Sequence, residues 1–256
     1  MATTNLSPTR PPSVIGSGWQ ALRRFSGAVK RNLALSMGLL LLASLVLFSV
    51  VGALVYDTDK AAPLSVPASR APSADYPLGT DQQARDMLAV MIVGTPLTLR
   101  IGIIAGIIGT GIGTILAFTA GYYGGAVDAV IRTIVDVGLT IPSLVVLIVI
   151  ALAVKGNMSV NDVALVVAST AWLWPTRSMR SQVLSMRERT YVQVARLSGM
   201  SAPETIVLEM MPNLTPFIAA SLVNSISQAV LASIGLEALG LGAIDVPTIG
   251  MTIYWA

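Results

Sequence analysis

Long apolar stretches constrain the fold of this chain more than any other feature of the sequence. A helix needs about 20 consecutive apolar residues to cross the hydrocarbon of a bilayer. The candidate spans are residues 33–56, 95–120, 133–154, 163–176 and 211–236. In the fourth, the apolar part stops at Pro175 and Arg177, which predicts a helix, 161–186, that projects beyond the membrane. The sequence therefore predicts an all-α, polytopic helical membrane protein.

Composition supports this fold class and excludes several kinds of catalysis. Of the 256 residues, 54% are hydrophobic and only 11% are charged, whereas soluble domains carry about 25% charged residues. The chain has no histidine and no cysteine, which excludes imidazole metal sites, disulfides and Ser-His or Cys-His catalysis. We therefore predict that the chain is not an enzyme, holds no metal and no cofactor, and binds no nucleic acid.

A glycine-rich stretch, "GIIAGIIGTGIGT" (102–114), superficially resembles a phosphate-binding loop. It lacks the Lys-Ser/Thr pair of a P-loop and the strand that precedes a dinucleotide fingerprint. Gly102/Gly106 and Gly109/Gly113 instead form small-x-x-x-small pairs, which let membrane helices approach closely. The stretch predicts a packing ridge, and any ATP hydrolysis must occur on another polypeptide.

The positive charges predict the orientation of the chain, because lysine and arginine are enriched on the cytoplasmic side of membrane proteins. If Met1 lies inside, 11 of the 16 basic residues fall on inner segments: Arg10, Arg23, Arg24, Lys30, Arg31, Arg132, Arg177, Arg180, Arg187, Arg189 and Arg196. The others lie outside or at the outer ends of helices: Lys60, Arg70, Arg85, Arg100 and Lys155. The bias favours a cytoplasmic N-terminus.

Polar segments flank or connect the predicted spans. Residues 1–16 have the Pro/Ser composition of a disordered cytosolic tail, and residues 17–32 predict an amphipathic helix along the inner membrane surface. Residues 57–90 form an extracytoplasmic segment that is too short for a domain. Residues 91–256 form the core, in which 188–212 is a polar inner loop.

The inner loop contains "YVQVARLSGMSAPETIVLEMMPN" (191–213), which predicts two short helices. Residues 190–198 read as the first helix, and Gly199 supplies a turn. Ser201 and Glu204 fit a capping box at the start of the second. The segment is too polar to insert and too ordered for a plain connector. Either a partner covers it, or the helix pair packs on the chain's own helix ends.

Two groups of polar residues lie within predicted spans. Asp136 is costly there, so it either lines a pathway or pairs with a neighbour such as Arg132. A second group occupies one face of the last span and consists of Ser221, Asn224, Ser225 and Gln228. That face predicts the wall of a translocation lumen, and the alternative is hydrogen bonding to adjacent helices.

The inner loop resembles the cytoplasmic loop of ABC importer permeases, whose pattern is Glu-Ala-Ala, three residues, Gly, and an Ile-x-Leu-Pro-like ending. Gln193, Val194 and Ala195 occupy the Glu-Ala-Ala places, and Gly199 and Pro212 match. "PLGTDQQARDML" (77–88), "GYYGGAVDAVIRTIVDVGLTIPSL" (121–144), "SQVLSMRERTYVQVAR" and "LGLGAIDVPTIGM" are similar to the peptide, nickel and oligopeptide branch, particularly its second, C-type permease.

The resemblance implies a type I (MetI-like) transmembrane domain in a bacterial inner membrane. It implies a second homologous permease, two cytosolic ABC ATPases that carry ATP and Mg, and an extracytoplasmic substrate-binding protein. The ATPase-coupling residues would be Tyr191, Gln193, Val194, Ala195, Arg196, Gly199, Met200, Glu204 and Pro212. Peptides are the cargo that the resemblance favours, with nickel, glutathione, haem and oligosaccharides as alternatives.

Three features leave other readings open. Gln193 stands where the family has a glutamate, and Glu237 stands where it has a small polar residue. The chain stops at Ala256 although relatives continue through one more span, so we expect either a truncated chain or a permease with one helix fewer. A secondary, ion-coupled transporter and a membrane scaffold protein are the alternative classes, but Asp136 is the only carboxylate well inside an apolar span.

Overall fold

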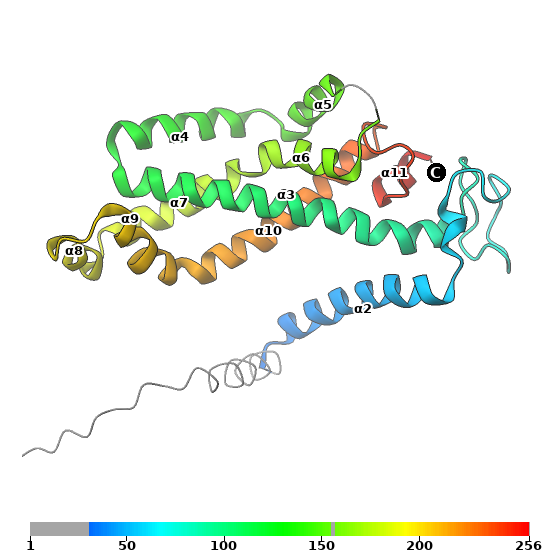
Figure 1. Ribbon diagram of the computed structural model, residues 1–256, viewed down its shortest axis with the longest axis horizontal. Coiled ribbons are helices and arrows are strands. Elements are labelled where there is room, and N and C mark those ends of the chain that lie inside the picture. Colours follow the sequence, from blue (N-terminus) through cyan, green and yellow to red (C-terminus); the bar gives the residue numbers. More distant parts are fainter. Residues whose placement is uncertain (1–30, 155–156, 256) are drawn as a thin grey trace, which may run out of the picture. The chain divides into compact units, whose positions relative to one another are not determined.

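The described part of the chain is helical, and no β-strand occurs in it. The computed structural model describes residues 31–154 and 157–255. The tail predicted at 1–16 and nearly all of the surface helix predicted at 17–32 therefore lie outside the described residues. The first elements are α2 (Leu33–Val55), η1 (Thr58–Ala61), α3 (Met87–Tyr123), α4 (Gly125–Thr140), α5 (Ser143–Ala153) and α6 (Val160–Ala171). They are followed by α7 (Leu173–Arg187), α8 (Thr190–Leu197), α9 (Ala202–Glu204), η2 (Thr205–Met210), α10 (Met211–Glu237) and α11 (Ile249–Trp255) (Figure 1).

Three helices of the described residues are long and apolar enough to cross a membrane. They are α2, α3 and the continuous run Ala202–Glu237 that ends with α10, and the bent pair α4–α5 can serve as one more span. The chain divides into two units after Phe48. Up to that residue, α2 is an apolar helix with almost entirely exposed side chains, a surface that suits lipid.

Helix α3 is longer than the predicted span 95–120 because it begins at Met87 and ends at Tyr123. Its 37 residues extend over about 55 Å at 1.5 Å per residue, whereas the hydrocarbon of a bilayer is about 30 Å thick. The Asp86 side chain caps its start by accepting from the backbone N–H groups of Leu88 and Ala89, at 2.8 and 3.3 Å. The helix therefore projects well beyond the membrane.

A proline inside α3 creates the attachment point for the end of α2. Pro96 has no N–H, so the carbonyl of Ile92 loses its helical donor. The Ser49 hydroxyl donates to this carbonyl over 3.1 Å. Gly52 lets the Ile92 side chain approach, because a Cβ at Gly52 would lie 2.7 Å from Ile92 Cγ1. These contacts hold the last turns of α2 against α3.

The predicted span 133–154 is interrupted in the structure. Helix α4 begins already at Gly125, and it meets α5 at an angle of 89°. The break follows from Pro142, which disfavours a helical conformation at the residue before it. Ile141 is extended accordingly, with φ −85° and ψ 128°. The bend turns α5 back towards α6, which it contacts.

The predicted helix 161–186 is divided in the same way, although more gently. Helices α6 and α7 are separated by Trp172, which keeps φ −84° and ψ −17°. Pro175 cannot donate to the carbonyl of Ala171, so the helical hydrogen-bond ladder is interrupted there. Ser159 and Asp162 cap the start of α6 through a reciprocal capping box.

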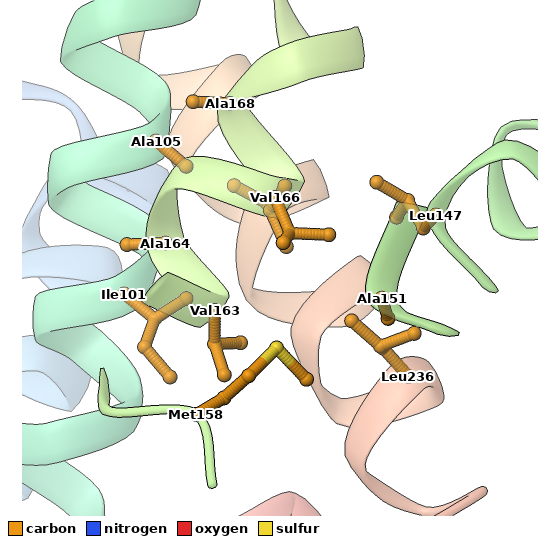
Figure 2. Close-up of a cluster of buried hydrophobic side chains, with 12 residues drawn as sticks. Ile101, Ala105, Leu147, Ala151, Met158, Val163, Ala164, Val166, Ala168 and Leu236 are labelled. Carbon is orange, nitrogen blue, oxygen red and sulfur yellow. The ribbon is translucent and has the colours of Figure 1, made fainter. Parts of the chain in front are cut away.

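The largest buried cluster lies where α3, α5, α6 and α10 meet (Figure 2). Ile101 and Val163 are fully buried, as are Leu147 and Leu236. Figure 2 shows Met158 reaching into the same cluster from the segment before α6. Moving an apolar side chain from lipid into a protein interior brings no hydrophobic gain. Burying side chains of this size therefore stabilises a helix bundle mainly through close packing.

The glycine ridge predicted in α3 packs against three different helices. A Cβ at Gly106 would lie 2.5 Å from Ile226 Cγ1 on α10, and one at Gly109 would lie 2.7 Å from the Ala171 Cβ on α6. A Cβ at Gly113 would lie 2.7 Å from the Cβ of Pro175 on α7. The prediction of close helix packing is confirmed, and α3 is the central helix of this unit.

The segment between α2 and α3 is held by buried polar groups. Arg85 and Asp81 are both buried and form an ion pair, with 2.7 Å between Nη2 and Oδ2. The Tyr56 hydroxyl donates to Asp86 over 2.6 Å. Burial, followed by this hydrogen bond, raises the pKa of the Tyr56 phenol to about 12. The segment is an ordered cap over the start of α3.

Candidate functional site

The polar loop forms two short helices joined at a sharp bend, as the sequence predicts. Helix α8 ends at Leu197, and Gly199 takes φ +86°, a left-handed conformation that glycine adopts without strain. Ser201 and Glu204 form the predicted capping box, in which the Ser201 N–H and hydroxyl donate to Glu204 Oε2 over 2.8 and 2.7 Å. We call residues 190–204 the elbow.

The elbow is attached to the C-terminal end of α3. The Arg196 guanidinium stacks on the Tyr122 ring, 4.6 Å from its centroid, and its Nε donates to the Tyr122 hydroxyl over 3.2 Å. Val192, which is fully buried, packs in a cluster with Tyr122. Arg196 is one of the predicted ATPase-coupling residues, and its guanidinium is engaged within the chain.

The opposite face of the elbow is open. Tyr191, Val194 and Leu197 are exposed, and Leu197 keeps 88% of its surface accessible. An open groove of about 1030 Å³ runs beside them. Its lining includes Met186, Arg189, Tyr191, Val194, Met200 and Glu209. An exposed apolar row beside a groove with both charge signs is suited to contact another protein.

The second half of the elbow continues without a gap into the longest stretch of helix after α3. Ala202–Glu237 is one helical run of 36 residues, in which η2 is a π-helical segment. Pro212 follows this π-helical segment inside the run, and it donates no backbone hydrogen bond there. Figure 1 shows α8 and α9 at one end of α3 and α10, and α11 at the other end. A displacement of the elbow therefore acts directly on α10.

Further along α10, a cavity of about 670 Å³ lies between this helix, the α4–α5 bend and the α6–α7 junction. The predicted residues Asn224, Ser225 and Gln228 line it, and Trp174 borders it from α7. None of the lining residues carries a formal charge. We call it the neutral cavity.

Ser221 is the member of the predicted polar face that does not line the neutral cavity. It is buried, and its hydroxyl oxygen has no hydrogen-bond partner within the described residues. Ser221 does not reach the neutral cavity because the cavity lining on α10 begins at Asn224, and Ser221 lies about one turn earlier. Of the same face, Asn224 and Gln228 are exposed, whereas Ser225 is buried.

Asp136 also lies outside the neutral cavity, in a smaller pocket of about 250 Å³ between α4 and α7. Its carboxylate is half-exposed and pairs with Arg132 at 3.7 Å, as one reading of the sequence predicted, and also with Arg177 at 3.9 Å. In the same region Asp128 binds Arg180 through two hydrogen bonds. The charges between α4 and α7 are thus largely paired.

Two contacts at the elbow had no clear signal in the sequence. Tyr122 is separated from Arg196 by 74 positions, so no local pattern connects them. Arg187 donates from Nη1 to the carbonyl of Gly121 over 3.2 Å. In the sequence, arginines that follow an apolar helix indicate where the membrane ends. They do not indicate which groups the arginine side chains bind.

Comparison with known proteins places this geometry in a family. Residues 109–254, more than half of the chain, match the family described as "Binding-protein-dependent transport system inner membrane component". The chain belongs to this family. The matched range includes the elbow, both cavities and the C-terminal part of α3 from Gly109 onwards. The recognition made from the loop pattern and its flanking blocks is thereby confirmed, as is a polytopic helical membrane fold.

Curated members of the permease family resemble the chain at moderate identity. The "Oligopeptide transport system permease protein OppC" of Mycobacterium tuberculosis is 29% identical over 171 residues, which is 67% of this chain and 59% of that protein. The "Dipeptide transport system permease protein DppC" of Bacillus subtilis is 29% identical over 214 residues, 84% of this chain and 66% of that protein. The "Probable D,D-dipeptide transport system permease protein DdpC" of Escherichia coli is 34% identical over 172 residues, 67% of this chain and 57% of that protein. The match thus spans less than two thirds of each relative.

Proposed function

We propose that this chain is a transmembrane permease subunit of an ATP-driven importer of peptides or similar small solutes. It forms half of the translocation pathway and catalyses no reaction itself. A second homologous permease supplies the other half, two cytosolic ATPases hydrolyse ATP with Mg, and an extracytoplasmic binding protein delivers the cargo. The curated relatives named as oligopeptide and dipeptide permeases support this proposal.

One observation carries the proposal: the second half of the elbow and the α10 wall of the neutral cavity belong to the same continuous helix. Asn224 is 22 positions beyond Ala202 in that run, a distance of about 33 Å along a straight helix axis. A motor that grips the elbow can therefore move the cavity wall without any contact of its own with the cargo.

The proposal includes an orientation and a contact surface. The elbow faces the cytosol of a bacterial cell, so the N-terminus is cytoplasmic and the segment before α3 is extracytoplasmic. The exposed side chains Tyr191, Val194 and Leu197, with the adjoining groove, contact the ATPase. The proposed coupling region also includes residues that border this contact surface or hold its helices in place: Gln193, Ala195, Met200, Glu204 and Pro212.

The bend at Gly199 provides the test. Valine disfavours the left-handed conformation at φ +86°, whereas asparagine tolerates it. We expect Gly199→Val to insert into the membrane but to lose co-purification of the ATPases and ATP-dependent uptake, and Gly199→Asn to retain both. Crosslinks from Tyr191 in the assembled complex should reach an ATPase subunit.

Three results would contradict the proposal. The first is unchanged ATPase binding and uptake in Gly199→Val. The second is crosslinking of Tyr191 only to helices of this chain. The third is uptake that survives ATP depletion and stops when an ion gradient is dissipated, which would favour the ion-coupled alternative.

A further inference from the structure

The lining of the neutral cavity combines apolar side chains with uncharged polar groups. It is built mainly from apolar side chains on five helices, and its polar groups are amides, hydroxyls and one indole. Asn224 and Gln228 present their amides from one face of α10, and Trp174 presents an indole that is 52% exposed. Such a wall offers hydrogen bonds and apolar contact, but no counter-charge.

The charged side chains near the cavity on α4 and α7 lie outside its lining and form ion pairs with one another. Arg177 lies two positions after Pro175, which lines the cavity, and Asp136 lies two positions before Gly138, which also does. These two side chains pair with each other at 3.9 Å and line the separate smaller pocket. Arg180, on the same helix as Arg177, is bound to Asp128. Arg132 shares Asp136 with Arg177, so these five groups carry one excess positive charge, but Arg132 and Arg177 are largely exposed and none of the five side chains lines the neutral cavity.

The size of the cavity fits a small solute. Its volume of about 670 Å³ lies within the range of about 300–1,000 Å³ that is usual for small-molecule sites. A peptide group that enters it can exchange hydrogen bonds with water for hydrogen bonds with the two amides, whereas an additional charge loses hydration without finding a partner.

We propose that the neutral cavity selects cargo by charge, an inference that rests on the permease function proposed above. It passes solutes of zero net charge, such as zwitterionic short peptides with uncharged side chains, and retards those with an additional charge of either sign. Asn224 and Gln228 set this preference, because their amides are the exposed polar groups that α10 presents to the cavity.

The test uses the complete importer, with its binding protein and ATPases, reconstituted in liposomes. ATP-dependent uptake is measured for three tripeptides that differ in one side chain: alanine, lysine or glutamate. Each is supplied at a concentration that saturates the binding protein, so that turnover and not capture is compared. We expect the unmodified importer to turn over the neutral peptide about tenfold faster than either charged one.

Charge variants at the cavity should redirect this preference. Gln228→Glu should raise the lysine-to-alanine rate ratio about tenfold and lower the glutamate-to-alanine ratio, because the new carboxylate attracts one sign and repels the other. Gln228→Lys should do the reverse, and Asn224→Asp should act like Gln228→Glu. Thr215→Glu places the same charge on the same helix outside the cavity lining and should leave both ratios unchanged.

The outcomes separate the inference from the function on which it rests. Equal turnover of neutral and charged peptides by the unmodified importer would overturn the charge selection while the permease function stands. The same holds if rate ratios do not move in the assembled Gln228 or Asn224 variants. Absence of ATP-dependent uptake of every peptide, in a complex shown to be assembled, would overturn the permease function itself.

Discussion

The close approach of α3 and α10 leads to a quantitative prediction at Gly106. A methyl group added there would lie 2.5 Å from Ile226 Cγ1 and 2.9 Å from both the Cα and the backbone nitrogen of Ile226. Relaxed carbon–carbon contacts lie at about 3.5–4.0 Å, so the two helices must separate by about 1 Å. Overpacking of this kind costs about 1–3 kcal/mol, and the higher helix propensity of alanine offsets up to about 1 kcal/mol. We expect Gly106→Ala to destabilise the protein by about 1–2 kcal/mol.

Gly111 on the same helix is the matched control, because no heavy atom lies within 4 Å of an added Cβ. Gly111→Ala should leave stability unchanged or raise it by up to about 1 kcal/mol. The free energy of unfolding can be measured by titrating the protein in mixed micelles with SDS and following tryptophan fluorescence. Ile226→Ala should rescue Gly106→Ala only in part, since two of the three close atoms belong to the backbone. Equal effects of the two glycine variants would refute the packing argument.

Two further predictions concern the attachments at either end of the bundle. Arg196→Ala should increase amide hydrogen exchange across Thr190–Leu197 by several-fold. It removes the stacking and the hydrogen bond to Tyr122, which together are worth about 1–2 kcal/mol. Arg196→Lys should keep only part of the protection. The phenol of Tyr56 ionises near pH 12 in the folded chain and near pH 10 when unfolded, so stability should be complete below pH 10 and should fall between pH 10 and 12. Tyr56→Phe should abolish that decline, and an unchanged decline would contradict the assignment.

Local chemistry made the elbow predictable from the sequence. Gly199, Ser201 and Glu204 act within a few positions of one another, so a turn and a capping box could be recognised without knowledge of the fold. The Gly106 and Gly109 pairs likewise signalled close packing, although not that one glycine faces α10 and the other faces α6. Short-range patterns indicate what a residue can do, whereas the partner depends on how helices are rotated about their axes.

The parts that could not be predicted depend on long-range geometry. Residues 133–154 were predicted as a single span. The 89° bend at Pro142 instead brings the second half of this segment back onto α6 and forms one wall of the neutral cavity. Ser221 shared the helical face of Asn224 and still falls outside that cavity, because periodicity gives the direction of a side chain but not how far a cavity extends along the axis. The sequence offered no reason for Glu237 at a position where the family has a small polar residue, and the structure buries it fully against Gly242 and Gly250.

The tight contact of Gly102 and Gly106 with Ile226 and Val230 also has a mechanical meaning. Backbones in such contact slide with difficulty, so a tilt of the helical run 202–237 would pivot about this point. The arm from Ala202 to Ile226 contains 24 residue steps and the arm from Ile226 to Glu237 contains 11, lengths of about 36 and 16 Å. A stroke of about 4 Å at the elbow would become a shift of about 2 Å beyond the pivot, with the force roughly doubled. A large displacement with a small force at the elbow would therefore become a small displacement with a larger force at the other end of the helix.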